Sequence, residues 1–150
     1  MPKRPHGTAR AGAPARLFVD SGAWIALRSR RDQHHAEADG LFREAIRRRL
    51  TLFTTNLIIA EIHRLTLFRA GLEAALRGLD RVESSPSVRL HFATARDHEE
   101  ALRWLGRLAP RPVTYTDAVS FSVMTAAGCK HFLGFDGDFV AAGFQPWPGR

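Results

Sequence analysis

Five acidic residues stand where a parallel-sheet protein gathers its functional groups, at the ends of predicted strands or on inward faces of predicted helices. They are Asp20, Glu61, Asp117, Asp136 and Asp138. Carboxylates crowded into one place repel each other and raise their own pKa values. A divalent cation removes that repulsion, and ligand sets made only of oxygen suit Mg²⁺ or Mn²⁺ better than zinc. Carboxylates that hold such ions are typical of enzymes that hydrolyse phosphodiesters.

Each carboxylate also has a purely structural interpretation. Asp20 can cap the helix predicted after it, as Asp often does. Asp117 stands three residues after Thr114, which is the spacing of a capping box. Glu61 lies on the apolar stripe of a predicted helix, where a salt bridge to a buried arginine or a position at a solvated edge would also account for it. For each residue taken alone, the sequence leaves both interpretations open.

The elements that would position these residues alternate between short apolar strands and amphipathic helices. Strands are predicted at 17–19, 52–54, 88–92 and 131–135, with a possible fifth edge strand at 144–147. Helical periodicity is found over 23–27, 34–50, 57–68, 71–84, 94–108 and 117–127. Ser21 is expected to cap the first helix, and 136–139 is expected to be a turn. The pattern predicts an α/β fold, a twisted parallel sheet of four to five short strands with helices on both faces.

Composition limits the class of protein. The chain has 150 residues, 45% of them hydrophobic, which fits one globular domain over 16–150. Residues 1–15 lack periodicity and are expected to form a disordered basic arm. No apolar run could span a membrane, and the single cysteine fits a reducing cytoplasm. The 22 Lys plus Arg residues against 15 Asp plus Glu give a net charge of +7, which is compatible with a polyanionic partner.

Four segments together resemble a known family. They are Phe18-Val19-Asp20-Ser21, the stretch from Thr55-Asn56-Leu57 to Ala60-Glu61-Ile62, Tyr115-Thr116-Asp117-Ala118, and Phe135-Asp136-Gly137-Asp138-Phe139. In this order and at these spacings the chain resembles a PIN domain, in particular the VapC-like toxin ribonucleases of bacterial toxin–antitoxin pairs. The resemblance extends from about Leu17 to Trp147, nearly the whole chain after the arm.

The resemblance implies a Mg²⁺- or Mn²⁺-dependent endoribonuclease that hydrolyses RNA and leaves a 5′-phosphate. On this analogy the catalytic, metal-holding residues are Asp20, Glu61, Asp117 and Asp136. Asp138 is an auxiliary ligand, and Ser21 and Thr116 are supporting residues. The family also implies homodimers and a cognate antitoxin protein that blocks the acidic groove. Three arginines of the predicted loop after the first helix are candidate RNA contacts: Arg28, Arg30 and Arg31.

Two other functions remain as alternatives. A non-catalytic PIN-like module would bind RNA or an antitoxin without cleavage. A phosphatase of the haloacid dehalogenase type needs a second Asp two residues after the first, and that position is Gly22. The chain also departs from the family at Gly134, where a Thr or Ser is frequent. If that hydroxyl positions a water at the metal, its loss predicts slower catalysis or weaker metal binding.

Overall fold

In a computed structural model of the chain, residues 15–149 are described. Nearly all of the predicted arm at 1–15 therefore lies outside the described residues. Five parallel strands form one sheet in the order β3-β2-β1-β4-β5. The strands are β1 (Arg16–Val19), β2 (Thr51–Thr55), β3 (Val88–His91), β4 (His131–Leu133) and β5 (Gln145–Pro146). The predicted α/β parallel sheet is confirmed, including its fifth strand.

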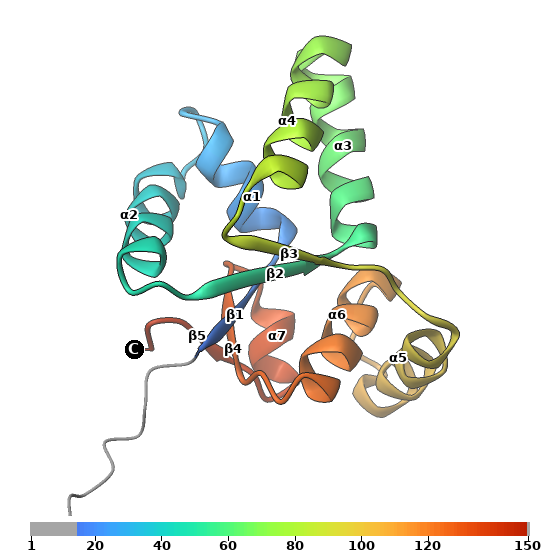
Figure 1. Cartoon of the computed structure of the whole chain (residues 1–150). Helices are drawn as coiled ribbons and strands as arrows, with labels where there is room; N and C mark the ends of the chain where they lie inside the picture. The colour runs from blue at the N-terminus through green and yellow to red at the C-terminus, as the bar shows by residue number, and fades with distance from the viewer. Residues whose placement is uncertain (1–14, 150) are drawn as a thin grey trace, which may run out of the picture.

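Helices cover both faces of the sheet (Figure 1). On one side lie α1 (Ser21–Arg28), α2 (His35–Arg47), α3 (Asn56–Ala70) and α4 (Leu72–Ser84), and on the other α5 (Ala95–Leu108), α6 (Tyr115–Ala126) and α7 (Gly137–Ala141). Helices α3 and α4 form a hairpin that projects away from the sheet, and Gly71 joins them with a φ of 87°, which favours glycine. None of the described helices is both long and apolar enough to cross a membrane.

The core forms where strand side chains meet α6 and α7. Phe18 and Phe132 are fully buried on adjacent strands that pair at this register. Phe139 of α7 stacks on Phe132 with ring centroids 4.7 Å apart, and Phe121 of α6 meets Phe139 edge-on at 4.9 Å. These aromatic contacts hold α6 and α7 against the ends of β1 and β4, where two of the predicted acidic segments begin.

The order of the strands creates a switch point between β1 and β4. From β1 the chain builds β2 and β3 on one side, and later returns to add β4 and β5 on the other. In open parallel sheets, ligands bind outside the carboxyl ends of the strands at such a point. The backbone N–H of Asp20 donates to the Leu133 carbonyl across 3.0 Å, so the two strands remain paired up to this edge.

Several predicted boundaries were wrong. Residues 136–139 do not form a simple turn, because Gly137 begins α7. Asp20 rather than Ser21 is the N-cap of α1. The predicted strand at 88–92 ends one residue early, and Phe92 is 65% exposed beyond it. The helix predicted over 34–50 ends at Arg47, which leaves room for a turn before β2.

Candidate active site

Asp20 is held rigidly at the carboxyl end of β1. Its side chain is only 3% exposed, and its Oδ1 accepts a hydrogen bond from the Ser21 backbone N–H at 2.7 Å. The structural interpretation of Asp20 as a helix cap is therefore correct. The capping role does not exclude metal binding, because a capping carboxylate at this edge still has oxygen lone pairs that face the neighbouring acids.

Asp117 and Asp136 are brought to the same place by the first turns of two other helices. Thr114 caps α6 by accepting from the Asp117 N–H at 3.1 Å, and the Asp117 side chain is buried. Asp136 caps α7, and its Oδ1 accepts from the Asp138 N–H at 2.9 Å. One carboxylate oxygen from each of Asp20, Asp117 and Asp136 lies within 4.8 Å of the other two. We call these three residues the aspartate cluster.

Glu61 joins the aspartate cluster through Ser21. The Ser21 hydroxyl donates to Glu61 Oε1 at 3.1 Å and lies 3.5 Å from Asp20 Oδ1. Glu61 is half-buried on α3, on the side that faces α1. Its polar position on an apolar stripe is thus explained by the contact with Ser21 of α1, and the described residues form no salt bridge with it.

Burial and mutual repulsion both disfavour the charged form of the carboxylates in the aspartate cluster. Burial raises the pKa of Asp20 to about 8, and the nearby charges of Asp117, Asp136 and Glu61 add to the shift. Burial and the charge of Asp136 raise the pKa of Asp117 to about 7, against the hydrogen bond from Thr114, which lowers it. Three convergent carboxylates that repel each other are a suitable donor set for a hard divalent cation.

Asp138 and Thr116 lie differently from the other predicted residues. Asp138 is outside the aspartate cluster, because its Oδ1 accepts a 2.6 Å hydrogen bond from Nε of Arg111 in the loop between α5 and α6. Its charge still contributes to the raised pKa of Asp117. Thr116 is half-buried in the first turn of α6, and its backbone carbonyl accepts from the Ser120 hydroxyl.

The three predicted arginines divide into one anchored and two exposed side chains. Arg28 is half-buried, and its Nη2 donates to the Ala74 carbonyl of α4 at 3.1 Å. It packs on Gly78, where a Cβ atom would collide with the guanidinium. Burial, together with the charges of Arg81 and Arg77, lowers the pKa of Arg28. Arg30 and Arg31 are exposed.

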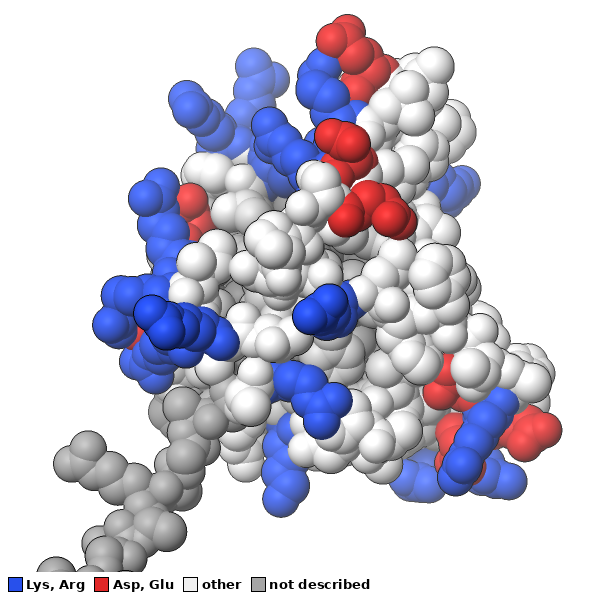
Figure 2. Space-filling model, in the orientation of Figure 1, with Lys and Arg blue, Asp and Glu red and all other residues white. Residues whose placement is uncertain are grey.

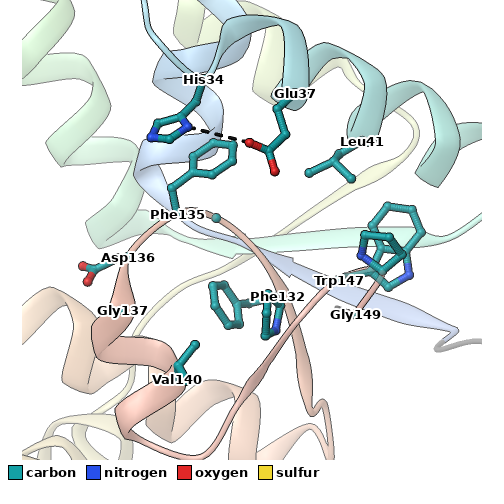
Figure 3. Close-up of a pocket in the computed structure, with 13 residues that line it drawn as sticks. His34, Glu37, Leu41, Phe132, Phe135, Asp136, Gly137, Val140, Trp147 and Gly149 are labelled. Carbon is teal, nitrogen blue, oxygen red and sulfur yellow. Dashed lines mark ion pairs between the residues drawn. The ribbon is translucent and has the colours of Figure 1, made fainter.

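Sequence reasoning missed the residues beside Asp136. The imidazole of His34 stacks on the Phe135 ring, with centroids 4.1 Å apart and planes 8° from parallel. Figure 3 shows both rings at the margin of a cavity that also has Asp136 at its edge. The sequence predicts surface positions for His34 and His35, because adjacent residues on a helix diverge by about 100° and so do not form a metal site together. Arg111 was also missed, since its partner is 27 positions away in the sequence.

Comparison with known proteins gives a consistent assignment. The family model for the PIN domain matches residues 17–145. Two relatives, from two strains of Mycobacterium tuberculosis, are each named 23S rRNA-specific endonuclease VapC20. Both are 35% identical over 128 residues, which is 85% of this chain and 95% of the relative.

A solved structure supports the same family. The crystal structure of Mycobacterium tuberculosis VapC20, described as a sarcin–ricin loop cleaving toxin, aligns with a TM-score of 0.77 and 34% identity. The alignment covers 85% of this chain and 95% of that one. The resemblance noted in the sequence is therefore confirmed: the chain belongs to the PIN domain family, among its VapC-like toxin endonucleases.

Proposed function

We propose that this protein is a divalent-metal-dependent endoribonuclease, the toxin of a toxin–antitoxin pair. The observation that carries the proposal is the convergence of Asp20, Asp117 and Asp136, each from a different strand end or helix start, with carboxylate oxygens within 4.8 Å. Asp20 and Asp117 are buried and Asp136 is half-buried, and such a group of acids is costly for the fold unless a cation or protons neutralise it. A ribonuclease can use a cation held by these acids, because the cation acts on the phosphodiester that the enzyme hydrolyses.

In this proposal the aspartate cluster holds Mg²⁺ or Mn²⁺. When bound, the cation would supply charge neutralisation at the scissile phosphate and activation of a water molecule. Glu61 would complete the acidic site, with Ser21 fixing its orientation through the 3.1 Å hydrogen bond. The rigid capping bonds of Asp20 and Asp136 limit the rotation of both carboxylates, so that little reorganisation is needed when substrate binds.

A groove rich in arginine offers a path for the RNA backbone. It lies between the end of α1, the outer half of α3 and α4, has a volume of about 570 Å³, and includes Arg28, Arg31, Arg69, Arg77 and Arg81. Among the described residues, no acidic side chain lines it. Figure 2 shows basic side chains gathered over this part of the surface, where the loop after α1 faces α4. Arg77 is paired with Glu73, but the other four arginines of the groove form no ion pair within the described part of the chain, and such arginines can bind phosphates bidentately.

The substrate class and partners are proposed from the names of the relatives and from the family. We infer that the substrate is a structured RNA, since the relatives are named for 23S rRNA. A cognate antitoxin protein and a homodimer are further parts of the proposal, supported by the family alone.

The test is cleavage of purified ribosomal RNA by the purified protein, with Mg²⁺ or with EDTA. Asp20→Asn removes one charge of the aspartate cluster while preserving side-chain size, and is expected to lower the rate at least about 100-fold. Glu61→Gln and Glu99→Gln form a matched pair, because Glu99 is exposed on α5 and is not a member of the aspartate cluster. The Glu99 variant should cleave at the wild-type rate. Undiminished cleavage by Asp20→Asn, or in EDTA, would overturn the proposal.

A further inference from the structure

A cavity of about 450 Å³ adjoins the aspartate cluster and is not used by the proposed metal chemistry. It lies between the start of α2 and the segments β4, α7 and β5 (Figure 3). Asp136 lies at one end of the cavity and Trp147 at the other. Because Asp136 belongs to both places, a group bound in the cavity would lie next to whatever is bound at the acidic site. The volume is within the usual range for small-ligand pockets, roughly 300–1,000 Å³.

One wall presents a flat aromatic surface with a carboxylate beside it. The His34 and Phe135 rings are stacked face to face and almost parallel, and both residues line the cavity. Glu37, one turn into α2, places Oε2 3.8 Å from His34 Nδ1. The carboxylate of Glu37 is exposed enough to accept hydrogen bonds from a ligand in the cavity.

The opposite wall is apolar and fixed. Trp147 is only 4% exposed, and its backbone N–H donates to the Phe132 carbonyl at 2.9 Å, which continues the pairing of β5 with β4. Val140 lies on the open side of this wall and is 53% exposed. No lysine or arginine is present among the described residues that line the cavity. Among the described lining residues, a phosphate would therefore meet the carboxylates of Glu37 and Asp136 and no lysine or arginine, although the Arg111 guanidinium lies close to Gly137 and Arg48 lies over the Trp147 ring at 5.7 Å. An uncharged planar ring would meet aromatic faces.

We propose that this cavity receives one nucleobase of the RNA next to the cleaved phosphate, and that Glu37 favours bases that carry an amino group. The inference depends on the proposed ribonuclease function. Single-stranded RNA is commonly read by stacking an unpaired base on aromatic side chains and by hydrogen bonds to its edge. Adenine, guanine and cytosine can donate an amino N–H to a carboxylate, which only accepts. Uracil would turn carbonyl oxygens toward it on either side of its single N–H.

The first experiment fills the cavity from its open side. Val140→Trp adds a large ring at an exposed position of α7, and its matched control is Ala141→Trp, at the next residue, which is exposed but does not line the cavity. Cleavage of RNA oligonucleotides is measured at varied substrate concentration. Val140→Trp should raise KM by about tenfold, the loss expected for one stacked base. Ala141→Trp should leave KM unchanged. Equal KM values for the two variants would overturn the proposal.

The second experiment tests base selection by Glu37. The nucleotide on each side of the cleaved bond is changed to each of the four bases, and wild type is compared with Glu37→Gln. Because the glutamine amide both donates and accepts, the variant should accept uracil about as well as the amino-bearing bases at the position that enters the cavity. The wild type should discriminate against uracil there by about tenfold. Absence of any base preference in the wild type at both positions would contradict the role given to Glu37.

A third measurement separates this inference from the ribonuclease proposal. Guanosine and uridine 5′-monophosphates are titrated without metal, and the Trp147 indole N–H signal is followed by NMR, assigned by its loss in Trp147→Phe. Guanosine monophosphate should shift this signal in wild type and not in Val140→Trp. If the signal shifts but no RNA is cleaved, the ribonuclease proposal fails and the base site stands. If RNA is cleaved but neither nucleotide shifts the signal, the base site is wrong and the ribonuclease proposal stands.

Discussion

Gly134 and Asp20 approach so closely that a Cβ atom added to Gly134 would lie 3.0 Å from the Cβ of Asp20 and 3.3 Å from the Phe132 ring. Neither Asp20 nor Phe132 can move away from such an atom. Asp20 is bound through its side chain to the start of α1 and through its backbone to β4, and Phe132 is almost fully buried. The absence of a side chain at position 134 therefore helps to set the place of the Asp20 carboxylate.

This contact predicts that Gly134→Thr lowers activity. The sequence alone suggested the opposite, since a hydroxyl at this position is frequent in the family. We expect the added atoms to displace Asp20 and to reduce both Mn²⁺ affinity and cleavage rate by about tenfold, as outer supports of metal ligands commonly do. Isothermal titration with Mn²⁺ and a cleavage assay measure the two effects. Gly106→Thr is the control, because no atom lies within 4 Å of a Cβ built there. A Gly134→Thr enzyme faster than wild type would show that the missing hydroxyl matters more than the crowding.

The raised pKa of Asp20 predicts that the metal-free protein becomes less stable as pH rises. In the unfolded chain Asp20 loses its proton near its ordinary pKa of 3.8, whereas in the fold it keeps the proton up to about pH 8. Between these values the folded state binds more protons, so the free energy of unfolding falls with increasing pH. Thermal unfolding in EDTA should give a lower Tm at pH 8 than at pH 5. Asp20→Asn should flatten this slope, and Glu99→Gln should not. A Tm that does not change over this range would contradict the electrostatic description of the cluster.

The hydrogen bond between Ser21 and Glu61 predicts a coupled loss of function. Ser21→Ala removes a bond of about 1 kcal/mol and leaves Glu61 without its orienting donor, so the cleavage rate should fall by about tenfold with little change in KM. Because both residues act through one contact, Ser21→Ala in the Glu61→Gln background should have almost no further effect. Ser122→Ala, which removes a buried hydroxyl bonded to the Ala118 carbonyl, controls for a general loss of stability. Additive losses for Ser21 and Glu61 would show that the two act independently.

The ion pair between Arg111 and Asp138 predicts that Asp138 contributes less to cation binding than Asp136. Asp138→Asn should weaken Mn²⁺ binding by about threefold, the effect of removing a nearby charge that is partly screened by solvent. Asp136→Asn removes a member of the aspartate cluster and should weaken binding far more. Calorimetric titration of the two variants at one pH compares them directly. Equal losses of Mn²⁺ affinity in the two variants would mean that Asp138 breaks its ion pair with Arg111 and itself ligates the cation.

Much of the acidic site could be predicted because its geometry depends on the sheet. Asp20 follows a buried strand, and Asp136 follows the strand that pairs with it, so both had to emerge at one edge. Asp117 was placed by the capping signal of Thr114, which the structure contains. Glu61 could be placed on an inward helix face by its periodicity, although its partner Ser21 could not be named as the donor.

The remaining features depend on contacts that a local pattern does not encode. Helix α7 has five residues, too few for a helical period, so the pattern at 136–139 indicates only a turn. Arg111 meets Asp138 across two elements, and nothing near either residue signals the pairing. His34 lies just before α2 and its side chain is 39% exposed, in agreement with the predicted surface position. Its stacking on Phe135 depends on the path of the chain after β4.

The central position of β1 has a consequence for the order in which the acidic site forms during synthesis. The sheet places β1 between β2, which follows it directly in the chain, and β4, which is made after β2 and β3, and Asp20 completes its surroundings only with Leu133 and Asp136. A nascent chain that has not yet reached β4 and the start of α7 cannot assemble the acidic site. The proposed nuclease therefore acquires its metal-binding residues as a set only after both halves of the sheet have been made.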